Sequence, residues 1–162
     1  MIKPTTLLIL LGLLAAAAGC RKAPTEIPRI SDPDWSGIAE FDINGNLIHD
    51  DPDDWLPRAQ SGSSAPLQVI PTFPNPTNGA VSIGFVIPGP LNLRVDVLAA
   101  PADTVATLIS GDLNPGNYRV QWDLRDPDGH PVPDGLYRVQ MNGHLPPPGG
   151  SVSSHGDIEV RR

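Results

Sequence analysis

The chain has 162 residues, and its 18 acidic side chains outnumber its 11 lysines and arginines, so that the formal net charge is -7. A protein without a basic cluster lacks the surface that nucleic-acid phosphates require, and we expect no nucleic-acid partner. The 16 glycines and 20 prolines leave little room for long helices, yet a hydrophobic content of 40% is enough for a core. We therefore expect a small, turn-rich β domain with extended flanks.

Residues 1–19 have the pattern of an export signal. Lys3 precedes an apolar run over residues 7–18, which is too short to span a bilayer but has the length of a signal-peptide core. Small residues lead from this run to Cys20, the single cysteine of the chain. The pattern resembles the lipobox of bacterial lipoproteins. An ordinary signal peptide followed by an unrelated cysteine, or an uncleaved anchor, is the alternative.

The lipoprotein resemblance implies a fate for Cys20. The cysteine would become the acylated first residue of the mature chain, and its acyl chains would hold the protein on a membrane. The next residue is Arg21. An aspartate at this position would resemble a signal that retains lipoproteins in the inner membrane, so we expect the outer membrane rather than the inner. Residues 20–31 would form a solvated tether between the lipid and the folded part.

Residues 32–56 form an acidic segment. Eight carboxylates and no lysine or arginine occur from Asp32 to Trp55. Residues 39–43 alternate between apolar and acidic, and Asn44-Gly45 favours a tight turn, which together predict a small hairpin. Trp35 and Trp55 flank this hairpin, and we interpret them as anchors that pack the segment on the domain; a ligand-stacking platform is the alternative.

The same segment offers a second interpretation, a calcium site. Asp42, Asn44 and Asn46 have the alternating spacing of oxygen ligands that begins an EF-hand-like loop, and Asp50 and Asp53 could complete it. The match is incomplete, because the loop's turn glycine and its final glutamate are both missing. The hairpin is therefore the first expectation and calcium the second.

Residues 57–66 are rich in serine and glycine, which predicts a flexible linker and a domain boundary. From residue 67 onward, short segments alternate between apolar and polar residues, and each predicts a strand with one buried face. These segments are residues 67–70, 81–87, 91–97, 104–109, 118–122, 137–141 and 157–161.

The turns between these segments predict how the strands are connected. Two turn signals, residues 126–129 and 133–135, lie within residues 118–141, which we expect to form a β-hairpin with an elaborate connection. We expect residues 143–156 to form a loose loop. About seven short strands separated by turns predict an all-β, antiparallel sandwich over residues 67–162.

Several landmarks in this region occur in a recognisable order. They are Pro74-Asn75-Pro76, the strands at 81–87 and 93–98, residues 105–108, Pro115-Gly116, Trp122-Asp123, residues 126–129, Pro133 and Gly135-Leu136-Tyr137. The order resembles that of FlgD-like immunoglobulin-like domains, and it is similar to the type A sorting domains of proteins exported by the type IX secretion system. The resemblance covers about residues 67–162 and implies an immunoglobulin-like β-sandwich.

No catalytic motif is evident. The four histidines lie in predicted loops without zinc spacing, and neither a phosphate-binding loop nor a nucleophile elbow occurs. Aspartates gathered near residues 118–141 raise the question of paired-carboxylate hydrolysis, but aspartate before proline and glycine is what turns require. These aspartates are Asp123, Asp126, Asp128 and Asp134. We therefore expect no enzymatic activity.

The leading hypothesis is a membrane-anchored cell-envelope lipoprotein whose immunoglobulin-like domain is a structural or protein-binding module with an envelope protein as partner. A second hypothesis makes residues 67–162 a secretion sorting signal, although an anchored protein has little need of one. A third makes the acidic segment the basis of a calcium-dependent or carbohydrate-binding surface protein.

Overall fold

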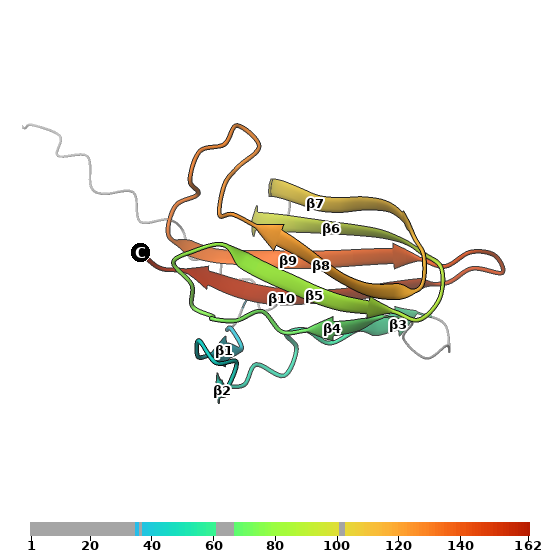
Figure 1. Ribbon diagram of the computed structural model, residues 1–162, viewed down its shortest axis with the longest axis horizontal. Coiled ribbons are helices and arrows are strands. Elements are labelled where there is room, and N and C mark those ends of the chain that lie inside the picture. The colour runs from blue at the N-terminus through green and yellow to red at the C-terminus, as the bar shows by residue number, and fades with distance from the viewer. Residues whose placement is uncertain (1–34, 36, 61–66, 101–102) are drawn as a thin grey trace, which may run out of the picture.

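The computed structural model describes residues 35, 37–60, 67–100 and 103–162, and each regular element in these ranges is a β-strand (Figure 1). The predicted signal peptide, Cys20 and the tether lie outside the described residues. Across the described ranges, no helix has the length and apolar character needed to cross a bilayer. The strands are β1 (Glu40–Phe41), β2 (Leu47–His49), β3 (Arg58–Gln60), β4 (Gln68–Ile70), β5 (Val81–Ile87), β6 (Leu91–Ala100), β7 (Asp103–Leu113), β8 (Gly116–Trp122), β9 (Gly135–His144) and β10 (Ser151–Val160).

Two antiparallel sheets pack on each other. The larger sheet has the order β3-β10-β9-β6-β7, and the smaller one, β4-β5-β8, lies in front of it in Figure 1. β1 and β2 form a separate two-stranded hairpin. The predicted antiparallel β-sandwich is confirmed, and the pairing of distant strands follows the immunoglobulin-like pattern.

The alternation that predicts the strands also selects their buried faces. In β6, Leu91, Leu93 and Val95 are at most 1% exposed, whereas Asn92 and Arg94 between them are exposed. β5 and β9 contribute matching rows from the two sheets to the same core. Each fully buried aliphatic side chain contributes about 1.5–3 kcal/mol, so these rows dominate the stability of the sandwich.

The expected hairpin over residues 118–141 is wrong. β8 pairs with β5 in the smaller sheet, whereas β9 pairs with β6 and β10 in the larger one. The two segments therefore face each other across the core, where the rings of Trp122 and Tyr137 lie 5.2 Å apart. The Tyr137 hydroxyl donates to the Pro133 carbonyl oxygen at 2.7 Å, like the tyrosine corner of immunoglobulin-like domains.

The expected loose loop over residues 143–156 is also wrong. β9 continues to His144 and β10 begins at Ser151, so a short connection joins two ten-residue strands. Turn hydrogen bonds close this connection, from the Leu145 N–H to the Gly150 carbonyl and from the Gly149 N–H to the Pro146 carbonyl. The polar stretch of residues 151–156 is a strand in which Val152, Ser154 and Gly156 are buried and the residues between them are half-buried.

The expected linker over residues 57–66 is only partly correct. Residues 58–60 form β3, which pairs with Ser151–Ser153 at the margin of the larger sheet, and residues 61–66 lie outside the described residues. Chain that precedes the expected domain boundary thus supplies a strand to the sandwich.

Candidate functional site

The acidic segment is joined to one end of the sandwich by buried polar contacts. The Asp54 carboxylate accepts hydrogen bonds from the Ala39 N–H and the Asp157 N–H, each at 2.9 Å. The Asn75 side chain donates to the carbonyl oxygens of Ala39 and Asp157 and accepts from the Glu159 N–H. Because both side chains bond to the hairpin segment and to β10, they hold the two together.

An ion pair lies beside these contacts. The Arg138 guanidinium binds both carboxylate oxygens of Asp157, each at 2.7 Å, and both residues are buried. The Trp35 ring lies 4.6 Å from the guanidinium carbon, which places a cation over an aromatic face. A bidentate pair of this kind fixes the orientation of the Arg138 guanidinium, and the Trp35 ring packs against that guanidinium.

The burial of these acidic groups changes how they titrate. Burial raises the pKa of Asp54 from the ordinary 3.8 to about 7, and the charge of Asp157 acts in the same direction. Burial likewise raises the pKa of Asp157, against the opposing effect of Arg138, and it lowers the pKa of His155. The contact between the acidic segment and β10 is therefore sensitive to protonation near neutral pH.

Both tryptophans are anchors, as the first interpretation predicts. Trp35 and Trp55 are 8% and 4% exposed. The Trp55 ring occupies the space beside Gly156, where a Cβ would overlap the indole, and the Trp55 backbone N–H donates to the His155 carbonyl oxygen. Their rings are buried, so neither offers a face to a ligand.

Three of the five proposed calcium ligands lie together in the turn between β1 and β2. Asp42 Oδ1 accepts from the N–H groups of Asn44 and Asn46, and Asp42 Oδ2 accepts from Asn46 Nδ2, each at 2.8 Å. Asp50 is exposed beyond β2, and Asp53 lies 3.5 Å from the imidazole of His155. The arrangement serves the predicted hairpin, and calcium binding stays a prediction.

The four clustered aspartates take part in turn hydrogen bonds and ion pairs in the described ranges. Asp126 accepts from the N–H groups of Asp128 and His130, while Asp123 and Asp134 approach Arg125 and Arg162. Asp126, Asp128 and His130 are the one group in these ranges with three metal-ligating side chains within 4.8 Å. Their hydrogen bonds are those of an aspartate-initiated turn.

The two margins of the larger sheet differ. Along β10, the backbone groups facing away from β9 are met by β3, by backbone groups of Trp55 and Thr77 and by side chains of Asp54 and Asn75. At the other margin β7 is the last strand and, within the described ranges, it pairs with β6 only (Figure 1). One margin is covered along its length, and the other presents its backbone outward.

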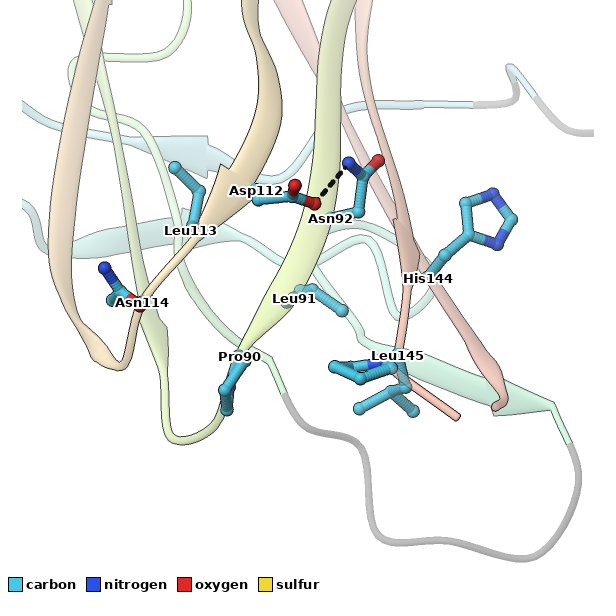
Figure 2. Close-up of a pocket in the computed structure, with 9 residues that line it drawn as sticks. Pro90, Leu91, Asn92, Asp112, Leu113, Asn114, His144 and Leu145 are labelled. Carbon is cyan, nitrogen blue, oxygen red and sulfur yellow. Dashed lines mark hydrogen bonds between the residues drawn. The ribbon is translucent and has the colours of Figure 1, made fainter. Parts of the chain in front are cut away.

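A pocket of about 460 Å³ lies where β7 ends (Figure 2). Asn92 Nδ2 donates to Asp112 Oδ1 at 2.7 Å on its rim, as the dashed line in Figure 2 shows. The residues around the pocket come from the start of β6, the end of β7 and the end of β9: Pro90, Leu91, Asn92, Asp112, Leu113, Asn114, His144, Leu145 and Pro146. Carboxylate, amide and leucine side chains thus meet in one hollow.

Comparison with protein families agrees with this architecture. Residues 73–145 match the family model of the FlgD Ig-like domain. The matched range contains β5 to β9, which supply strands to both sheets, and it excludes the acidic segment and β10. No curated protein matches the chain. Residues 73–145 are therefore similar to a FlgD Ig-like domain, and residues 37–60 add a segment that is docked on β10.

Sequence reasoning missed the groups that dock this segment. Asp54 is one of several acidic residues in a row, and Arg138 alternates with apolar residues like any solvent-facing strand residue. Neither position carries a local signal of burial. Only the contact between segments distant in sequence identifies them.

Proposed function

We propose that the protein is a membrane-anchored cell-envelope lipoprotein whose FlgD Ig-like domain serves as a structural or protein-binding module without catalytic activity. The single observation that carries the proposal is the FlgD Ig-like domain itself, an antiparallel sandwich at residues 73–145. Sandwiches of this kind bind through strand edges and loops, and the edge of β7 is open in the described part of the chain.

The anchor in this proposal depends on Cys20. Acylation there would place the domain at a membrane surface, and two or three acyl chains hold a protein far more firmly than one. The residue after the cysteine, Arg21, favours the outer membrane as the location. An envelope protein is then the expected partner.

Intact mass and membrane fractionation of the native protein beside Cys20→Ser test the anchor. We expect an acylated chain that begins at Cys20 and sediments with membranes, and a soluble Cys20→Ser chain. Cross-linking on intact envelopes, followed by mass spectrometry, tests for the protein partner.

A secreted chain without acyl groups would refute the anchor. It would also remove the main objection to a sorting role for residues 67–162. Fusion of those residues to a passenger protein, followed by its location inside or outside the cell, would then decide that question.

A further inference from the structure

We propose that the open edge of β7, together with the pocket at its end, binds an extended peptide segment that carries a lysine or arginine. The inference rests on the proposed role as a protein-binding module and names the surface and the class of partner. Backbone hydrogen bonds to β7 would supply affinity, and the side chains beside Asp112 would supply specificity.

The edge of β7 is long and has little protection against pairing with another strand. β7 has 11 residues and contains no proline, lysine or arginine. Natural proteins protect edges with short strands, prolines or charges, especially basic ones, and the two edges of the smaller sheet show such protection, whereas both charges of β7 are acidic. β4 has three residues, and β8 carries the exposed Arg119.

One half of β7 has a regular pairing register with β6. Ile109 to Leu113 pair in step with Val95 to Leu91, whereas the register shifts between β6 and β7 fall from Val95 to Ala100. A regular ladder directs backbone groups outward at every second residue, which is what an added strand needs. Residues 109–113 are therefore the part of β7 that can accept a partner.

The charge of the β7 edge is negative. Asp103 and Asp112 are the only charged residues of β7, and within the described ranges neither carboxylate forms an ion pair. An antiparallel pairing of two copies of β7 over its whole length would bring Asp103 of each copy opposite Leu113 of the other, and Asp112 opposite Thr104. Such a pairing gives neither carboxylate a cation and joins two chains that each carry a net charge of -7, so the edge fits a basic strand better than a second copy.

The pocket at the end of β7 combines a carboxylate with apolar surface. Asn92 fixes the Asp112 carboxylate on its rim, and Leu91, Leu113 and Leu145 supply apolar surface beside that carboxylate (Figure 2). Lysine and arginine combine an apolar stem with a cationic end, so one such side chain fits both parts of the hollow. The pocket and the open edge share Asp112 and Leu113, so a segment bound along the end of β7 lies next to the pocket.

The test uses the full chain with Cys20→Ser and a labelled, blocked peptide of alternating valine and lysine, about eight residues long. Fluorescence anisotropy measures binding, and amide hydrogen exchange locates it. Asp112→Lys reverses the charge at the site. Asp128→Lys is the matched control, because it makes the same change at an exposed residue outside β7.

We expect Asp112→Lys to weaken binding by about tenfold or more, because the variant replaces an attractive charge contact with a repulsive one. Asp128→Lys should leave binding nearly unchanged. Exchange should slow at residues 109–113 when peptide is present. A peptide with glutamate in place of lysine should not bind.

Equal weakening by both variants, or slowed exchange along β8 instead of β7, would overturn the proposal. So would self-association of the chain that Asp112→Lys abolishes, because a second copy would then occupy the edge. If the envelope cross-linking finds the same partner for wild type and Asp112→Lys, the binding role stands and the β7 site fails. If it finds no partner, the binding role fails, and the peptide measurements still decide what the edge binds.

Discussion

Replacement of Trp55 and Gly156, singly and together, measures how firmly the acidic segment belongs to the sandwich. Trp55→Ala removes a side chain that is 4% exposed, and such substitutions cost about 3–5 kcal/mol in free energy of unfolding. Gly156→Ala places a methyl group where the indole lies, and overpacking of this kind costs about 1–3 kcal/mol. Against a typical stability of about 5–15 kcal/mol, each loss is large.

The double variant carries the decisive information. The methyl group of Gly156→Ala enters the space that Trp55→Ala vacates, so the double variant should be more stable than the sum of the single losses by about 1–3 kcal/mol. Urea unfolding of the full chain, followed by circular dichroism, gives all three free energies. Additive losses, or a Gly156→Ala variant as stable as wild type, would show that the indole does not pack against residue 156.

Three further predictions concern charge. Because the pKa of Asp54 is about 7 when folded and lower when unfolded, the stability that this group contributes below pH 4 is lost as pH rises toward 7, by at most roughly 4 kcal/mol. The free energy of unfolding of Asp54→Asn should therefore fall less between pH 5 and pH 8 than that of wild type, even if the variant is less stable at each pH. Urea unfolding at several pH values measures this, and an unchanged pH profile would contradict it. Arg138→Leu should cost about 3–5 kcal/mol because it leaves Asp157 buried without its cation, and adding Asp157→Leu should recover part of that loss; a double variant less stable than the single would refute the pairing. For calcium, titration calorimetry should show heat with wild type that Asp42→Ala abolishes, and no heat in either protein would end the calcium hypothesis.

The individual strands could be predicted from sequence because their signal is local. Residues 81–87 and 91–97 alternate between apolar and polar positions, and the structure places β5 and β6 there with one face buried. Side chains of a strand point to opposite faces in turn, so a single segment already records which residues meet the core. Turn residues likewise mark where each strand ends.

Strand pairing was harder to predict. Residues 118–122 and 137–141 are close in sequence and both alternate, which favours a hairpin, yet they lie in different sheets. Alternation says that a strand has a buried face and does not say which neighbour shares its hydrogen bonds. The end of β9 was missed for a related reason, because a strand whose outer face meets solvent resembles a polar loop.

The sequence by itself determined an all-β sandwich, the approximate positions of its main strands and the anchoring role of the two tryptophans, since apolar alternation and large apolar side chains act through local burial. Tertiary structure alone decided which polar groups hold residues 37–60 on the sandwich and that β7, in the described part of the chain, pairs on one side only. The bond from the Asp157 N–H to Asp54 joins residues 103 positions apart, and the coverage of β10 depends on such contacts. A buried charge is stable only with its partner in place, and no local pattern reveals a partner that folding brings from a distant part of the chain.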